Sequence, residues 1–538
     1  MGDPVGTHRR AGVVVPLFSI PSSGSWGIGE IADLPLLADW MRGSGLSVVQ
    51  LLPVNEMADG QTSPYSAQSA MAIDPIFIAL RDVPDFLARG GMSSLEDEEI
   101  ENLVAARASR SVDYRVVREL KNRCLRDAFD MFWEREWSAG TDRGAALRAY
   151  IDRERWWLDD YALFRALHTE NGGRPWSEWQ PGVRNREPGA LTAARLRLAR
   201  DILYHAFLQW VAGEQWSHAR AACTGIAIFG DFPFMVSGDS ADVWARQHEF
   251  RMDASVGVPP DAFSETGQDW GLPIYRWDVH EQNGDEWIRM RARRSADLFD
   301  GFRVDHLVGF FRTFVRERDG HTYFVPSDEP TQRAQGERIL RALQDAGAEL
   351  VAEDLGVVPE FVRESLAAMG VPGLKVLRWE REWHAAGQAF LDPAAFPVLS
   401  VAMTGTHDTE TLAEWWANAE GEERTRATEL PAFIEAAITA DETFSNRVRD
   451  ALLETLFGTG SRLALMPMQD IFGWPDRINV PAVVSDENWS WRLPWPVDEM
   501  LHHTDPSDRA TFLERLAQRT ARVNGGDGGN GFHNGGTE

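Results

Sequence analysis

The chain has 538 residues, of which 43% are hydrophobic and 25% charged, a composition typical of globular proteins. Its formal net charge of −28 would repel nucleic-acid phosphates and anionic membranes over most of the surface, so we expect neither as a partner. The two cysteines, Cys124 and Cys223, support neither a disulfide framework nor a cysteine-based metal site.

Residues 1–11 are expected to form a flexible N-terminus ahead of a short apolar run. Two arginines before that run resemble a signal peptide, but Pro16 interrupts the run and no small-residue cleavage site follows. No apolar stretch approaches the 18 or more residues of a membrane span. The sequence therefore predicts a cytoplasmic protein.

Eight short runs rich in valine, isoleucine and leucine recur along the chain, and several carry polar or acidic residues at their C-terminal ends. Buried parallel strands have this pattern. The eight predicted strands are 13–18, 48–54, 226–233, 301–306, 350–355, 374–379, 400–408 and 463–470.

Helical patterns separate several of these runs. Residues 332–346 carry Ile339, Leu340 and Leu343 at helical spacing, and residues 359–369 begin with a proline at a first-turn position and stop before Gly370. Eight strands that alternate with helices indicate an α/β fold, the (β/α)8 TIM barrel, whose active site lies at the C-terminal ends of the strands.

The alternation breaks in two places. Between 82 and 215 we expect a mostly helical insertion, in which Ser93 and Glu96 fit a capping box ahead of a long amphipathic stretch through Trp137. Residues 234–298 are rich in Asp, Trp, Gly and Pro and predict long loops over the barrel mouth. The catalytic barrel would then span 12–522, followed by a disordered glycine-rich tail, 523–538.

The run GFRVDH, residues 301–306, ends in polar groups that are costly to bury unless they are paired. Because side chains alternate along a strand, Gly301, Arg303 and Asp305 project to one side. An adjacent guanidinium lowers the pKa of a carboxyl, so Arg303 would keep Asp305 ionised, as a nucleophile or electrostatic stabiliser requires. The alternative is a buried Arg–Asp pair that only stabilises the barrel.

Two further acids end predicted strands. Glu353 closes the next strand, with Asp354 facing the opposite way, and a carboxyl among apolar groups tends to stay protonated and can donate a proton. Asp408 follows His407 two strands later, where it could instead cap a helix that begins near Thr409. Glu353 or Asp354 by itself could equally be a solvated or helix-capping acid.

Acids at the mouths of strands four, five and seven of one barrel can converge on a single pocket. Two carboxyls about 5 Å apart form the arrangement of retaining glycosidases. A metal cluster of His407, Asp408 and Glu410 is an open alternative, since metal-dependent hydrolases also use barrel mouths. For the leading interpretation we expect no metal and no cofactor.

Several ordered motifs between residues 12 and 495 together resemble the 4-α-glucanotransferases, also called amylomaltases or disproportionating enzymes. The motifs are SWGIGE, SPYS, GDFPF with DSADVW, GVPPDAFSETGQDWG, GFRVDH, AEDLG, PGLKVL, TGTHDT, and RINVP with NWSWR. The resemblance implies a retaining α-amylase-type barrel that acts on maltooligosaccharides and other α-1,4-glucans.

The same resemblance implies a role for each matching residue. Asp305 would be the nucleophile that forms a covalent glucosyl intermediate, Glu353 the general acid and base, and Asp408 the stabiliser of the distorted sugar. Arg303 would hold the nucleophile ionised. The residues expected to bind glucan are His407, Ser63, Tyr65, Asp231, Gln268, Trp270, Phe263 and Asn479.

The chain departs from the family pattern at three positions. Ala262 stands where we expect tyrosine, Leu272 replaces an asparagine, and Trp26 replaces a tyrosine, changes that we expect to affect product size and acceptor preference. An α-glucan hydrolase of the same clan and a non-catalytic glucan-binding protein are the alternative functions. Oligomeric state does not follow from the sequence.

Overall fold

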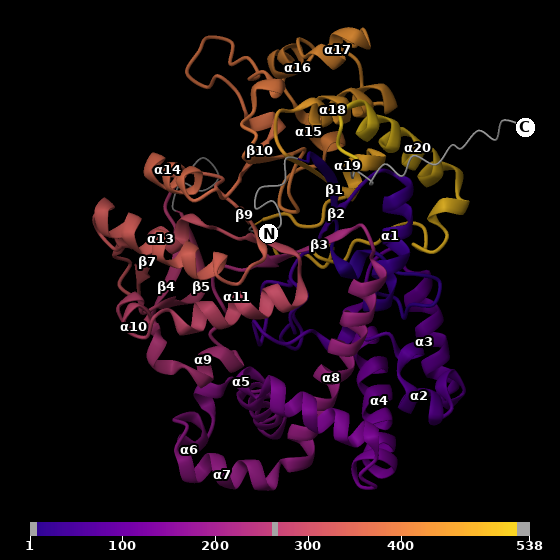
Figure 1. The fold of residues 1–538 in the computed structure, drawn as a ribbon, viewed down its shortest axis with the longest axis vertical. Coiled ribbons are helices and arrows are strands. Elements are labelled where there is room, and N and C mark those ends of the chain that lie inside the picture. Colours follow the sequence, from indigo (N-terminus) through magenta and orange to yellow (C-terminus); the bar gives the residue numbers. More distant parts are fainter. Residues whose placement is uncertain (1–7, 261–266, 482, 524–538) are drawn as a thin grey trace, which may run out of the picture.

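The computed structural model describes residues 8–260, 267–481 and 483–523. Eight parallel strands form a closed barrel in the order β1-β12-β11-β10-β9-β6-β3-β2, so the predicted TIM barrel is confirmed (Figure 1). The barrel strands are β1 (Arg10–Val14), β2 (Val48–Gln50), β3 (Ala227–Phe232), β6 (Gly301–Val304), β9 (Glu349–Ala352), β10 (Gly373–Val376), β11 (Ser400–Met403) and β12 (Leu463–Pro467). Each overlaps one of the eight predicted runs.

Helices pack around the barrel and follow its strands in the chain. The main ones are α1 (Leu34–Gly43), α8 (Ala199–Ala222), α11 (Glu286–Leu298), α13 (Glu329–Gln344), α14 (Glu360–Ala368), α15 (Leu412–Asn418), α18 (Asn446–Gly458) and α20 (Thr504–Arg519). Shorter ones are α9 (Ala241–Ala245), α10 (Trp277–Gln282), α12 (Val308–Phe311), α16 (Gly421–Ala427), α17 (Pro431–Glu435) and α19 (Met468–Phe472). Pro359 is the N-cap of α14 and not its first residue, a correction of one position.

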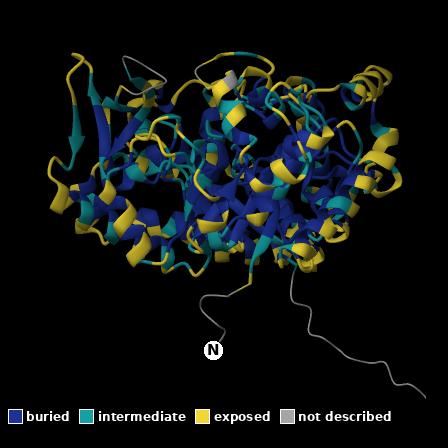
Figure 2. Cartoon of the chain, turned by 90° about the horizontal axis from the view of Figure 1, so that it is seen from above, coloured by how far each residue is buried: buried dark blue, intermediate teal, exposed yellow. Residues whose placement is uncertain are grey.

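The core has two parts. Side chains that point into the barrel, among them Val48, Phe229 and Leu465, form a small inner cluster. A much larger cluster fills the space between the barrel and its helices. In Figure 2 the buried residues occupy the middle of the molecule and the exposed ones its rim. Trp26 is 2% exposed and packs against Phe86 in the larger cluster.

The region 82–215 is mostly helical and forms the lower part of Figure 1. Its helices ahead of α8 are α2 (Pro84–Ala88), α3 (Asp97–Ala108), α4 (Tyr114–Phe132), α5 (Asp142–Glu170), α6 (Pro181–Arg184) and α7 (Pro188–Arg197), with a π-helical turn at Trp133–Trp137. The predicted Ser93–Glu96 capping box is wrong. The box joins Glu96 to Glu99, because α3 begins at Asp97. The predicted long amphipathic stretch through Trp137 consists of two helices, α3 and α4, and the π-helical turn.

The prediction of long loops for 234–298 is also wrong in part, because this segment contains α9, α10, α11 and two strands. The strands β4 (Phe250–Val258) and β5 (Gln268–Tyr275) join β7 (Thr313–Glu317) and β8 (Thr322–Val325) in an antiparallel sheet of order β5-β4-β7-β8. This sheet lies beside the barrel (Figure 1). Within the described ranges, no helix combines the length and apolar composition that a membrane crossing needs.

Candidate functional site

Arg303 lies at the centre of a group of carboxylates at the mouth of the barrel. The register between β3 and β6 sets Asp231 opposite Arg303, and Asp305 and Glu353 directly follow β6 and β9. The buried guanidinium contacts Asp231 Oδ2 at 2.5 Å, Asp305 Oδ1 at 2.9 Å and Glu353 Oε2 at 2.7 Å. The expected Arg303–Asp305 pair is therefore present, together with two further partners.

Asp305 and Glu353 share one atom of that guanidinium. Both carboxyls contact Nη2, so the two contacting oxygens lie within about 6 Å of each other, a limit compatible with the roughly 5–5.5 Å between the carboxyls of retaining glycosidases. Their side chains are 23% and 21% exposed, which leaves both accessible to a ligand. Asp354 faces away, as expected, and accepts a hydrogen bond from the Leu374 N–H at 2.8 Å.

The ionisation of this pair differs from the expectation that Arg303 keeps Asp305 charged. Burial and the nearby Glu353 and Asp231 carboxylates raise the pKa of Asp305 to about 8, although Arg303 opposes this. Burial also acts to raise the pKa of Glu353, but Arg303 and the His306 N–H together lower it. Glu353 has two donors where Asp305 has one, so a proton shared by the pair favours Asp305 over Glu353.

His306 supports Glu353, a role that the sequence did not reveal. Its backbone N–H donates to Glu353 Oε2 at 2.7 Å, and its φ of 42° is in the left-handed region. Its ring contacts Trp270 of β5 edge to face, at 4.8 Å between centroids. Trp270 Nε1 in turn donates to Gln268 Oε1 at 3.3 Å. The antiparallel sheet thus brings Trp270 and Gln268, both expected to bind glucan, to the side of the site that carries Glu353.

Asp408 lies on the other side of the site and does not cap a helix. The helix after it begins at Leu412 with Thr411 as its cap. Asp408 Oδ1 accepts from Asn479 Nδ2 at 2.6 Å, and Oδ2 lies 3.2 Å from His407 Nε2. These partners outweigh burial and lower the pKa of Asp408, while the Asp408 charge raises that of His407 despite its burial.

Tyr65 joins the two sides of the site. Its hydroxyl donates to Asp231 Oδ2 at 2.8 Å and lies 3.2 Å from His407 Nε2, and the two rings stack. Ser63 Oγ accepts from the Tyr65 N–H at 3.4 Å. The Asp231 side chain has no exposed surface and is joined to the site through Arg303 and Tyr65.

Trp489 is a further aromatic residue of the site that was not predicted from the sequence. Its ring lies 5.8 Å from Tyr65 and 5.7 Å from His407, and its φ is 63°. Its only signal in the sequence is its place in the motif NWSWR. Phe263 and Ala262 lie outside the described residues. Leu272 is half-buried in β5, opposite Val256.

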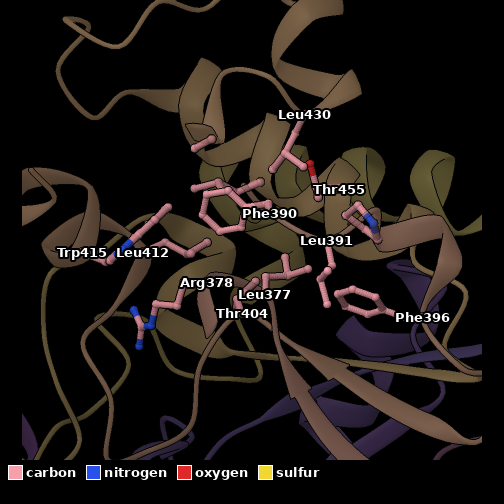
Figure 3. A pocket seen from close by; sticks show the side chains of 13 residues that line it. Leu377, Arg378, Phe390, Leu391, Phe396, Thr404, Leu412, Trp415, Leu430 and Thr455 are labelled. Atoms are coloured by element: carbon pink, nitrogen blue, oxygen red, sulfur yellow. The ribbon is translucent and has the colours of Figure 1, made fainter. Parts of the chain in front are cut away.

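An apolar pocket lined by residues that include Leu377, which follows β10, and Thr404, which follows β11, offers no alternative site. Figure 3 shows its lining, in which Phe390, Leu391 and Phe396 pack over Leu377, while the guanidinium of Arg378 points away. Its volume of about 10 Å³ holds no more than one water.

The alternative metal cluster finds no support in the geometry. Over the part of the chain that the structure describes, histidine, cysteine and acidic side chains, including His407, Asp408 and Glu410, form no group of three or more that could hold a metal ion.

Comparison with known proteins gives one consistent result. The sequence profile of the 4-alpha-glucanotransferase family matches residues 15–498. The chain is 35% identical to the 4-alpha-glucanotransferase of Thermus thermophilus, over 90% of this chain and 95% of that protein. It is 30% identical to that of Chlamydia pneumoniae, over 93% and 94%. The structure of an amylomaltase from Streptococcus agalactiae in complex with acarbose superposes with a TM-score of 0.80 at 27% identity, covering 96% of this chain and all of that one.

Proposed function

The chain belongs to the 4-alpha-glucanotransferase family and is an enzyme of that class, and on this premise we propose that it transfers α-1,4-glucan segments to the 4-hydroxyl of glucose or a maltodextrin by a retaining mechanism. The observation that carries the mechanism is the placement of Asp305 and Glu353 on one guanidinium nitrogen, within about 6 Å of each other.

In the first step Asp305 attacks the anomeric carbon of the donor and Glu353 protonates the departing glycosidic oxygen. The C–O bond to the leaving sugar breaks as the bond to Asp305 Oδ forms. This step needs the shared proton on Glu353. A glycosidic oxygen next to Glu353 is a hydrogen-bond acceptor that favours the protonated form, and Arg303 then stabilises Asp305 as the carboxylate.

In the second step the 4-hydroxyl of an acceptor sugar attacks the glucosyl–Asp305 ester. Glu353, now a carboxylate, takes the hydroxyl proton, and Asp305 leaves as a carboxylate. Two inversions give net retention. Water in place of the acceptor would give hydrolysis, so the balance of transfer and hydrolysis depends on which nucleophile reaches the ester first.

The remaining residues bind the sugar chain. Asp408, His407 and Asn479 form a polar wall that can accept and donate hydrogen bonds to the hydroxyls of the distorted sugar. Aromatic rings cover the apolar faces of pyranose rings, a role that fits Trp270 and Tyr65. Gln268, Ser63 and Phe263 complete the proposed glucan path.

Incubation with pure maltotriose tests the proposal. Disproportionation gives glucose together with maltodextrins longer than the substrate, resolved by chain length, whereas hydrolysis alone gives only glucose and maltose. Asp305→Asn removes the nucleophile and should abolish both activities. Unchanged turnover by this variant would refute the assigned nucleophile, and an absence of turnover by the wild type would favour a glucan-binding protein.

A further inference from the structure

Tyr65 is carried by a long loop between β2 and α2, here called the Tyr65 loop, residues 55–74. Antiparallel bridges pair Asn55 with Ile73 and Met57 with Ala67, so the loop is folded back on itself. Tyr65 lies near its turn, where it contacts Asp231 and His407. The placement of one wall of the site therefore depends on what holds this loop.

Two residues on α5, one turn apart, hold both sides of the loop. The Tyr161 hydroxyl donates to Glu56, and Arg165 Nε lies 3.2 Å from Glu56 Oε1. Arg165 Nη1 also donates to the side-chain oxygen of Gln68. The Gln68 N–H donates to the Glu56 carbonyl at 2.7 Å, across the fold of the loop. Tyr161 and Arg165 thus fasten the two sides of the loop to each other and to the helical insertion.

The contacts of Tyr161 and Arg165 with the Tyr65 loop are buried, so water cannot easily replace them. Exposure is 4% for Glu56, 1% for Gln68 and 1% for Tyr161. Burial raises the pKa of Glu56, and Arg165 and the Tyr161 hydroxyl counter this by favouring the carboxylate. Removing a donor from a buried carboxylate is costlier than removing an exposed contact. The loop is consequently sensitive to Tyr161.

A second support acts at the end of the loop. Gln209 of α8 accepts from the Ile73 N–H at 3.0 Å and donates to the Ile73 carbonyl at 2.8 Å. Gln209 Nε2 also lies 3.2 Å from the Tyr161 hydroxyl. Tyr161 is therefore the point at which the supports from α5 and α8 meet.

We propose that Tyr161 and Arg165 are positioning residues for the transfer reaction, which fix the Tyr65 loop so that the Tyr65 hydroxyl reaches Asp231 and His407. This inference rests on the proposed function. It gives the helical insertion a role in catalysis, exerted through the loop and without contact to the sugar.

Tyr161→Phe is the test, because it removes one hydroxyl and keeps the ring. Tyr150→Phe is the matched control: Tyr150 is also buried on α5, but its hydroxyl donates to the Gln209 backbone carbonyl and not to the loop. With maltotriose we expect kcat of Tyr161→Phe to fall about tenfold, with KM within about threefold of the wild-type value, because small displacements of catalytic groups cost this much or more. Tyr150→Phe should retain kcat within about twofold.

Combination with Tyr65→Phe separates positioning from general destabilisation. If Tyr161 acts through Tyr65, adding Tyr161→Phe to the Tyr65→Phe variant should lower kcat by less than about twofold. If the two losses instead multiply, or if Tyr161→Phe alone retains wild-type kcat, the inference is overturned.

Hydrogen exchange gives a readout that does not depend on activity. Peptides within residues 57–70 should exchange about tenfold faster in Tyr161→Phe than in the wild type, and at the wild-type rate in Tyr150→Phe, because opening becomes easier only where the fastening is lost. Unchanged exchange in Tyr161→Phe would refute the positioning role. Failure of the wild type to act on maltotriose would instead refute the proposed function.

Discussion

Replacing Glu353 by glutamine should lower the pKa of Asp305 by an amount that follows from the distance between the two side chains. The amide oxygen of glutamine still accepts from Arg303 and the His306 N–H, but the negative charge is gone. The contacting oxygens of Asp305 and Glu353 lie within about 6 Å of each other, and two unit charges at that distance repel by about 3 kcal/mol at an effective dielectric constant of about 20. This energy corresponds to a fall of about 2 in pKa. The pKa of Asp305, about 8 in the wild type, should therefore fall toward about 6 in Glu353→Gln.

Fluoride release from α-glucosyl fluoride in the presence of maltose measures this pKa. Fluoride leaves with little help from an acid, so kcat/KM as a function of pH reports the ionisation of the free nucleophile. The rate should rise with pH through about 8 in the wild type and through about 6 in Glu353→Gln. Maltotriose turnover, which needs the acid, should fall by a factor of about 10² or more in this variant.

Asp354→Asn is the control for the electrostatic part of this prediction. Asp354 is adjacent in sequence but points toward Leu374, and asparagine keeps the acceptor oxygen. Its pH profile should match that of the wild type. If the pKa of Asp305 obtained from the pH profile stays at about 8 in Glu353→Gln, or rises, the coupling of the two carboxyls is refuted.

Other consequences concern stability and metals. Burial raises the pKa of Asp242 from 3.8 to about 6. The stabilisation that protonated Asp242 gives the folded state is therefore fully present below pH 4 and is lost as the pH rises through 6, by up to about 3 kcal/mol. In Asp242→Asn the amide oxygen still accepts from the Ala70 N–H and does not titrate. The free energy of unfolding in urea should therefore rise relative to that of the wild type between pH 4 and 8, and a difference that stays constant with pH would contradict this. Gly230→Ala places a Cβ 2.4 Å from the Phe299 ring and should lower the free energy of unfolding by about 1–3 kcal/mol, measured in the same way. Exhaustive chelation should leave maltotriose turnover unchanged, and its loss would revive the metal-dependent alternative.

The barrel could be predicted because its strands are buried on both faces and read as continuous apolar runs. The strand ends could not be placed equally well. The seventh run, 400–408, extends beyond β11, which stops at Met403, because residues 404–408 form the turn that carries Asp408. The antiparallel sheet was missed for a different reason. Half-exposed β4 has no clear apolar run, and it pairs with β7, about 60 residues further along the chain.

The partners of Arg303 depend on register, which the sequence does not contain. Alternation along 301–306 placed Arg303 beside Asp305 correctly, but only the alignment of β3 with β6 puts Asp231 opposite Arg303. Arg303 lowers the pKa of Asp305 as predicted, but the sequence showed neither the burial nor the two further carboxylates that raise it.

In the proposed mechanism, the charge balance of the site favours the reaction over binding alone. Four carboxyls, Asp231, Asp305, Glu353 and Asp408, lie around one permanent cation, Arg303, with His407 beside Asp408. The raised pKa values of Asp305 and His407 favour the protonated forms of both groups, which offsets part of the surplus negative charge. A neutral glucan brings no positive charge to these carboxylates. The oxocarbenium-like transition state does, so the surplus negative charge stabilises the transition state more than the bound substrate, and this difference lowers the barrier.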